Sequence, residues 1–219
     1  HLIKNLDRIS IHDSIFNYKS GEKALLSLQK GNYRKWLNTL LPNTRLILEP
    51  KIKGIWLAIF YENGKLRKAI NKNSEDKTEA VLIIKNIPKS IPIKHNLQIF
   101  GELYHFKNKN TISRKNDFYV IQGTGVELEE LNFCAYHIFN CKLNHYQSLI
   151  ELKNLNFEIP DTEFTNFISD VEIYLECWKE GKLFTKYPTN GLVMKINSRK
   201  LQKQLGENNV CINWAFAIE

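Results

Sequence analysis

The 219-residue sequence lacks any apolar run long enough to cross a membrane, and no signal-peptide pattern opens it. Its four cysteines lie far apart, and none has the CxxC spacing of a zinc knuckle or a redox motif. Without a secretion signal, reduced thiols are expected rather than disulfides. These absences argue against a membrane-spanning or secreted protein and predict a cytoplasmic one.

Internal repeats and low-complexity linkers are also missing, and no cluster of proline, glycine and serine marks a domain boundary. A chain of this length without such a boundary predicts a single domain over residues 1–219, and we expect a monomer. Within it, residues 1–44 are expected to form an N-terminal helical part and residues 45–219 the core. The 43% hydrophobic content suffices for a sizeable core.

The net charge of +8 points to a polyanionic partner, although the lysine and asparagine richness could also reflect a biased genome. If the partner is DNA, nicked or otherwise, lysine and arginine side chains would meet its phosphates. Binding should then be weak, independent of base sequence and strongly salt-sensitive.

Hydrophobic periodicity predicts strands interrupted by helices. One or two helices are expected over residues 20–42, with Ser20 as a cap and Pro42 as the end. Asn63-Gly64 predicts a hairpin turn between two strands. Further strands are expected at 97–106, 132–139, 190–197 and 212–219, and further helices at 76–85, 144–156, 163–182 and 198–206. Hairpins without regular βαβ alternation indicate an antiparallel-rich α+β fold.

Four charged residues stand inside otherwise apolar strands: Glu49, Lys51, Glu102 and Lys195. A lysine in a tightly placed pocket can act as a nucleophile, and Lys51 lies between Pro50 and a glycine. For any one of the four, a structural ion pair is the simpler explanation, Lys51 with Glu102 for example. Taken as a set, they favour a site for a nucleotide phosphate.

A zinc site is the alternative for Cys134, His137, Cys141 and His145, which are close in sequence. The segment "NFCAYHIF" has the pattern of a strand, in which Cys134 and His137 would point to opposite faces. We therefore expect no metal bound by these four residues.

Several segments together resemble the adenylation domain of NAD-dependent DNA ligases. "EPKIKGIWLAIFYENGKLRKAI" is similar to that family's nucleophile segment, Glu-Pro-Lys-Ile-Asp-Gly followed by a Tyr-Glu-Asn-Gly hairpin. "FGELY", "LNFCAYHIF" and "HYQSLIELKNLNFEIP" resemble its next strand and helix motifs. "YPTNGLVMKINSRKLQKQLG" and "NWAFAIE" match its last strands, and "RISIHDSIF" is a weaker echo. The resemblance covers residues 45–219 in the right order.

The resemblance implies a nucleotidyltransferase fold, like the core of ATP-grasp-type ligases, whose lysine takes AMP from NAD with the help of Mg²⁺. It also implies a role for each matching residue. Lys51 would be the nucleophile and Lys195 would hold the α-phosphate. Glu49 would contact adenine, Tyr136 would stack on it, and Glu102 would hold the ribose or support Mg²⁺.

Departures from the family pattern concentrate on the catalytic positions. Lys53 and Asn190 replace two aspartates, and Glu219 replaces a phosphate-binding lysine. Only Lys72 remains where the family has an arginine in a Thr-Arg-Gly-Asp segment. An Asn-Pro-Arg-Asn-Ala-Ala-Ala-Gly segment is replaced by residues 113–130. Lost carboxylates weaken metal binding, and a carboxylate at a phosphate contact repels the phosphate.

We therefore expect a ligase-like adenylation domain that is impaired or inactive and binds AMP or NAD weakly. The alternative is a non-catalytic pseudoenzyme that binds nucleic acid, an adenine nucleotide or a protein partner. The nicotinamide-binding, oligonucleotide-binding, zinc, helix-hairpin-helix and BRCT parts of such ligases would lie outside these 219 residues. Because Lys53 and Glu219 exchange sign, we also predict that they form an ion pair. The pair could be direct or bridged by one water. The competing possibility is that Lys53 reaches inward to substitute for the missing phosphate lysine. If the two residues lie apart and both face solvent, the changes are simple decay.

Overall fold

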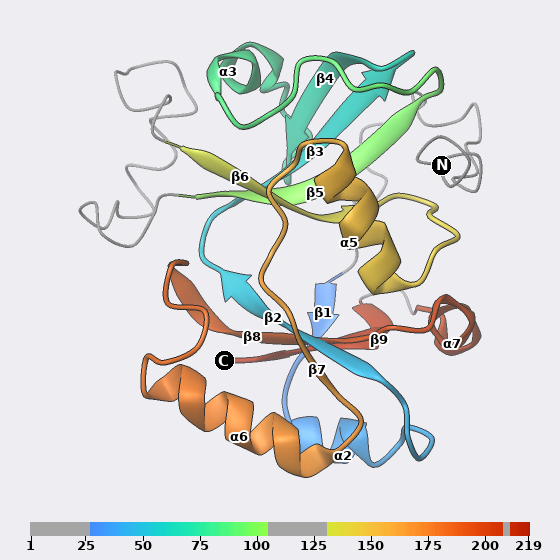
Figure 1. Ribbon diagram of the computed structural model, residues 1–219, viewed down its shortest axis with the longest axis vertical. Helices are drawn as coiled ribbons and strands as arrows, with labels where there is room; N and C mark the ends of the chain where they lie inside the picture. The colour runs from blue at the N-terminus through green and yellow to red at the C-terminus, as the bar shows by residue number, and fades with distance from the viewer. Residues whose placement is uncertain (1–26, 105–130, 208–210) are drawn as a thin grey trace. The chain divides into compact units, whose positions relative to one another are not determined.

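The computed structural model describes residues 27–104, 131–207 and 211–219. The chain divides into two compact units, each with its own sheet (Figure 1). The first contains residues 54–143 and 147–159, and the second contains residues 25–53, 144–146 and 160–219. Each is described by itself, and the expectation of a single domain stays a prediction.

The first unit is built on a four-stranded antiparallel sheet in the order β4-β3-β5-β6. Its strands are β3 (Ile55–Glu62), β4 (Lys65–Asn71), β5 (Leu97–Tyr104) and β6 (Asn132–Ile138). Helix α3 (Thr78–Ile83) and most of helix α5 (His145–Asn154) belong to this unit. The apolar core of this unit is formed by side chains of the sheet together with side chains of both helices. It includes Leu57, Ile59, Val81, Ile99, Phe133, Leu149 and Leu152.

The turn between β3 and β4 is the one that the sequence predicts. Asn63 has φ of 48° and Gly64 has φ of 75°, as the central residues of a type I′ turn require. A Cβ on Gly64 would lie 2.3 Å from the carbonyl oxygen of Ile91, so the packing also demands glycine. The turn therefore sets the register in which Glu62 faces Lys65, next to it on the two strands.

The second unit is built on a five-stranded sheet in the order β1-β9-β8-β2-β7. Its strands are β1 (Ser27–Gln29), β2 (Leu46–Ile52), β7 (Glu163–Thr165), β8 (Thr189–Ile196) and β9 (Cys211–Ile218). All neighbouring pairs are antiparallel except β1 with β9. Its helices are α2 (Tyr33–Leu37), α6 (Ile168–Lys179) and α7 (Arg199–Leu205).

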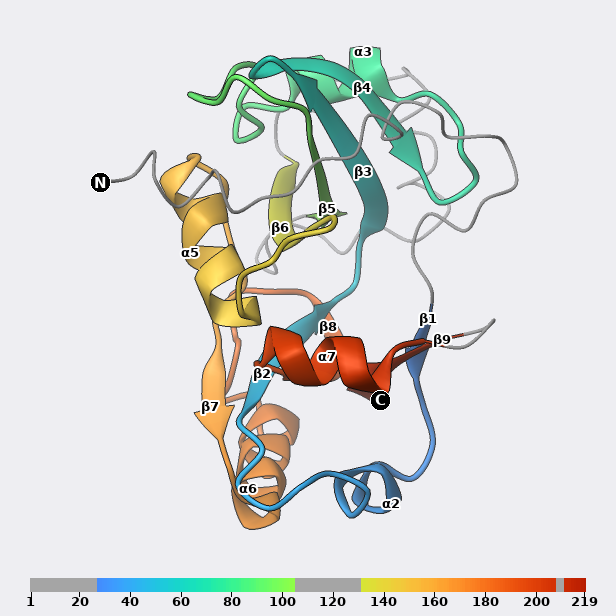
Figure 2. The same cartoon turned by 90° about the vertical axis from the view of Figure 1, so that its right-hand side faces the viewer.

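One face of this sheet carries the apolar core of the second unit. Leu48 pairs with Met194, and Met194 pairs with Phe216, so their side chains share that face. Helices α2 and α6 cover it (Figure 2), and the rings of Trp36 and Phe216 lie 5.6 Å apart between centroids. The opposite face is therefore the one on which polar residues of β2, β8 and β9 gather.

Two predicted helices contain strands instead. Residues 27–29 form β1, although the leucine spacing around them has a helical pattern, because they pair with β9. Residues 163–165 form β7 on the edge of β2, so helix α6 begins only at Ile168. The predicted cap at Ser20 and the segment 8–16 lie outside the described residues.

The other predicted elements are confirmed, with ends that move by a few residues. Ser198 caps α7 by accepting a hydrogen bond from the amide of Leu201, and Gly206 ends the helix. The four cysteines are free thiols, as expected. In the three described stretches, no helix has both the length and the apolar character needed to cross a membrane.

Candidate active site

Charged side chains follow one face of the three adjacent strands β2, β8 and β9 in the second unit. Glu49 pairs with Val193, and Val193 pairs with Ala217, so these three residues share the face. Lys195 lies two residues along β8 from Val193, and Lys51 lies two residues along β2 from Glu49. The strands thus place two lysines and a glutamate on the same face as the smaller side chains of Val193 and Ala217.

Glu49 is buried between two partners, Lys195 and His145, at the inner end of this row. Its Oε2 accepts a hydrogen bond from Lys195 Nζ at 2.6 Å, and its Oε1 contacts Nε2 of His145, the first residue of α5. Glu49 is 3% exposed and Lys195 is 6% exposed. For these two residues the structure thus shows the ion pair that the sequence left as an alternative.

The charges within this cluster follow from its burial. Burial by itself raises the pKa of Glu49, but attraction to Lys195 and His145 outweighs it and lowers the pKa to about 2. Burial, followed by repulsion from Lys195, lowers the pKa of His145. Near neutral pH the carboxylate is therefore ionised, Lys195 is its cation, and a neutral His145 donates the second hydrogen bond.

Stability should consequently fall in acid. Glu49 titrates at about 2 when folded and near 4.5 when unfolded, so the unfolded chain binds more protons between these values. Its contribution is complete above pH 4.5 and is lost as the pH falls through 2. We expect the melting temperature of Glu49→Gln to depend less on pH over this window than that of the wild type. Differential scanning calorimetry at matched pH values measures it, and parallel curves would contradict the assignment.

Lys51 lies at the outer end of the row, where two acceptors hold its Nζ. Asn190 Oδ1 accepts a hydrogen bond at 3.0 Å, and Glu219 Oε1 is 2.8 Å away. Lys30 Nζ lies 2.7 Å from the same Glu219 oxygen. These hydrogen bonds, from Lys30 and then from Lys51, lower the pKa of Glu219 to about 2.

Gly191 explains how β8 and β9 come so close at this end. It has φ of 150°, and a Cβ there would lie 2.0 Å from the carbonyl oxygen of Ile218. Only glycine fits that approach. It brings the end of β9, with Glu219, beside the start of β8, with Asn190.

The predicted ion pair between Lys53 and Glu219 is wrong. Glu219 pairs with Lys51 and Lys30 instead. Lys53 follows the last residue of β2 and is exposed, while its backbone amide donates to the carbonyl oxygen of Pro188. Lys51 lies within β2, which pairs with β8, whereas Lys53 lies just after β2. The side chain of Lys51 is therefore the one that reaches Glu219 at the end of β9.

The other predicted site residues belong to the first unit. Glu102 lies on β5 and pairs with Cys134 on β6, the strand that also carries Tyr136. Lys72 follows β4 and is exposed. Their convergence with Lys51 stays a prediction. The replaced segment 113–130 lies outside the described residues.

Two residues of the site carry no sequence signal that singles them out. Lys30 stands in a lysine-rich segment predicted to be helical, and the spacing around His145 suggests only a zinc ligand. Their roles come from long-range pairing of β1 with β9 and from the position of the start of α5.

The arrangement holds a primary amine, Lys51 Nζ, at the end of the strand face that also carries Lys195, with Asn190 and Glu219 as its acceptors. An amine so held can attack a phosphorus atom once it has lost its proton, and nearby cations can neutralise phosphate charge. Within the described part of the chain, no three His, Cys, Asp or Glu side chains gather as a metal site.

Comparison with known proteins identifies a family of DNA ligases. The NAD-dependent DNA ligase adenylation domain model matches residues 20–122 and 121–219. The DNA ligase of Metamycoplasma arthritidis is 27% identical over 239 residues, covering 94% of this chain and 36% of that protein. A Prochlorococcus marinus DNA ligase is 28% identical over 259 residues, covering 98% and 37%. The chain thus spans about a third of the length of these relatives.

Solved structures agree on the fold. An archaeal ATP-dependent RNA ligase superposes with a TM-score of 0.57 at 12% identity, covering 88% of this chain and 47% of that one. A Lig E DNA ligase gives 0.55 at 14% identity, covering 89% and 68%. These ligase nucleotidyltransferase cores confirm the antiparallel-rich α+β fold predicted from the sequence. With the family model matching nearly its whole length, the chain belongs to the NAD-dependent DNA ligase adenylation domain family.

Proposed function

We propose that this domain transfers AMP from NAD to Lys51 Nζ, at a reduced rate, as the first step toward sealing a nicked DNA strand. The observation that carries the proposal is the position of Lys51. Its Nζ lies at the end of a strand face that also holds Lys195 and Glu49, and Asn190 orients it at 3.0 Å. Family membership supplies the reaction class.

In the proposed step, Lys51 first gives a proton to solvent water. The nitrogen lone pair then attacks the phosphorus of the AMP half of NAD. A P–N bond forms as the P–O bond to nicotinamide mononucleotide breaks, and that nucleotide leaves with its phosphate. Such in-line displacements depend mostly on positioning and charge neutralisation. Lys195 would supply positive charge beside the phosphate, with Glu49 and His145 fixing its position.

The reduced rate follows from the groups around Lys51. A carboxylate whose pKa is about 2 is a poor proton acceptor, so Glu219 cannot serve well as the base for Lys51. Asn190 keeps the hydrogen bond to Lys51 but carries no negative charge with which to bind a metal. The ion pair on Lys51 also favours the second candidate, a non-catalytic domain that keeps the fold and some affinity for an adenine nucleotide, nucleic acid or a protein partner.

Magnesium does not fit the described residues as a site built by the protein. Mg²⁺ is usually held by one or two carboxylates together with substrate phosphates. The two family aspartates near Lys51 are Lys53 and Asn190 here, and the described residues hold no metal-ligand cluster. The roles given to Lys51 and Lys195 do not depend on the ion.

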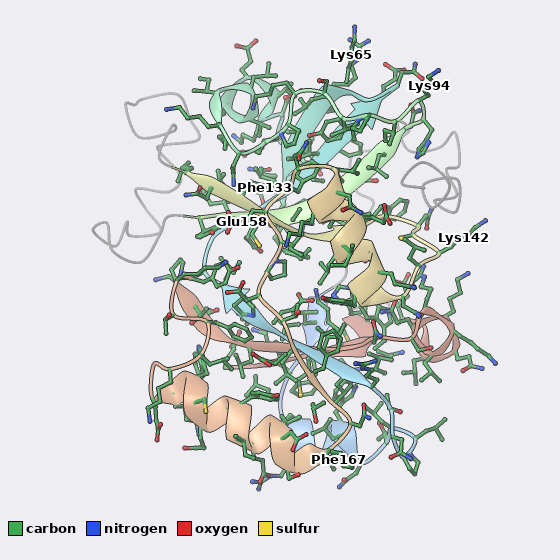
Figure 3. The ribbon with its side chains drawn as sticks, viewed as in Figure 1. Lys65, Lys94, Phe133, Lys142, Glu158 and Phe167 are labelled. Atoms are coloured by element: carbon green, nitrogen blue, oxygen red, sulfur yellow. The ribbon has the colours of Figure 1, made fainter. Side chains whose placement is uncertain are left out.

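DNA is the proposed acceptor of the AMP group, bound mainly through phosphate contacts. Lys65 and Lys94 are exposed on the first unit, and their side chains point away from its sheet (Figure 3). Exposed lysines of this kind give binding that is independent of base sequence and falls steeply with salt. A gel shift at low salt that is lost at high salt would support this part of the proposal.

Intact-mass spectrometry after incubation with NAD and Mg²⁺ tests the proposed function. We expect a slowly formed adduct of one AMP in the wild type and none in Lys51→Ala, which lacks the nucleophile. Lys182→Ala, an exposed lysine of the same unit, should keep the adduct. An adduct that persists in Lys51→Ala would mean that the nucleophile lies elsewhere. Absence from the wild type would favour the non-catalytic candidate.

A further inference from the structure

Two lysines from separate segments converge on a single oxygen atom. Lys30 follows β1 and Lys51 lies on β2, yet their Nζ atoms lie 2.7 Å and 2.8 Å from Oε1 of Glu219. The oxygen thus sits between two ammonium groups, as an oxygen of a bound phosphate would. Glu219 reaches this place from the end of β9, and the side chain of Asn190 completes the surroundings of Lys51.

We propose that Lys30 and Lys51 form a phosphate-binding site that Glu219 occupies, so that Glu219 competes with the phosphate of an incoming nucleotide. The inference rests on the proposed function, because it names a second phosphate-binding lysine and an internal competitor at that site. In this site Lys30 is the second cation that binds the phosphate. Glu219 is a positioning residue that holds both lysines together while no anion is bound.

The contacts argue for a competed site rather than an ordinary surface ion pair. The side chain of Lys51 is only 20% exposed, while that of Glu219 is 44% exposed. The carboxylate is therefore more accessible than Lys51 and, like the 59% exposed side chain of Lys30, it can swing out into water. Once it does, the two cations are left facing each other across the vacated position, and their mutual repulsion favours any anion that replaces it.

The expected size of the effect follows from charge. With Glu219 in place, an arriving phosphate must displace it or bind beside a negative charge a few ångströms away. Removal of that charge with retention of the side chain's shape, as in Glu219→Gln, should tighten phosphate binding about tenfold at low ionic strength. High salt should reduce the gain, because much of the site is open to solvent.

Inorganic pyrophosphate is a suitable probe, because its binding needs neither adenine recognition nor the transfer step. We would titrate the whole chain by ³¹P NMR, comparing the wild type, Glu219→Gln and the double variant Glu219→Gln with Lys30→Met. Glu172→Gln is the matched control. Glu172 belongs to the same unit, is 43% exposed and pairs with Arg34 at 2.8 Å.

We expect about tenfold tighter binding for Glu219→Gln, no change for Glu172→Gln, and loss of the gain in the double variant. Glu219→Ser should behave like Glu219→Gln, which guards against an effect peculiar to one substitution. Equal affinity of Glu219→Gln and Glu172→Gln would overturn the proposal, and so would a gain that survives Lys30→Met. The AMP-adduct assay reports on the proposed function separately, so failure of transfer and failure of phosphate competition are distinguishable.

Discussion

Replacement of Glu49 with alanine is expected to lower the free energy of unfolding by about 3–5 kcal/mol, because it removes one partner of a buried ion pair. Lys195 is 6% exposed, and its ammonium would remain in a low-dielectric environment without the carboxylate at 2.6 Å. His145 would lose its acceptor on Glu49 as well. Urea denaturation followed by circular dichroism measures the change.

Glu172→Ala is the control for this substitution. It breaks an exposed ion pair with Arg34, and exposed pairs contribute about 0–1 kcal/mol. A second comparison separates pairing from burial: joint replacement by Glu49→Leu and Lys195→Met removes both charges and should recover much of the loss. If Glu49→Ala costs no more than Glu172→Ala, the buried pair is not what stabilises this face of the sheet.

Gly191→Ala should be destabilising by about 2–4 kcal/mol and should also reduce adduct formation. Its Cβ would lie 2.0 Å from the carbonyl oxygen of Ile218, and a backbone atom held in the β8–β9 ladder cannot move away cheaply. Separation of these strands would disturb Asn190, which orients Lys51, and this loss of positioning is what should reduce adduct formation. Thermal unfolding and intact-mass spectrometry measure the two effects.

Gly181→Ala is the matched control for Gly191→Ala. Gly181 also has a positive φ, 69°, but a Cβ there would meet no atom within 4 Å. Its replacement should therefore cost only the backbone strain, about 1 kcal/mol. Equal costs at the two glycines would show that the close approach of β8 and β9 is not needed.

Local sequence patterns predict those parts of the fold that depend on neighbouring residues. The Asn63-Gly64 turn needs positive φ at two adjacent positions, which that residue pair supplies. Glu49, Lys51 and Lys195 interrupt apolar strands, and each has an ion-pair partner in the structure, because an apolar strand tolerates a charge only where a partner or a polar site awaits it. The family resemblance adds the reaction, which no periodicity could indicate.

Partners that are distant in the sequence are what the patterns miss. Ser27–Gln29 has helical leucine spacing around it, but its backbone hydrogen bonds go to β9, almost two hundred residues later. From the sign exchange, Lys53 is the predicted partner of Glu219, but Glu219 pairs with Lys51 and Lys30. The choice of Lys51 and Lys30 depends on where β2 ends and on the approach that Gly191 permits.

The central claim is that Lys51 is the nucleophile of an adenylation domain restrained by its own carboxylate. Its most direct test is tandem mass spectrometry of peptides from the wild-type chain and Glu219→Gln after prolonged incubation with NAD and Mg²⁺. The account predicts AMP on the peptide that contains Lys51, accumulating faster in Glu219→Gln. AMP on any other lysine, or no AMP on Lys51 in either protein, would contradict it.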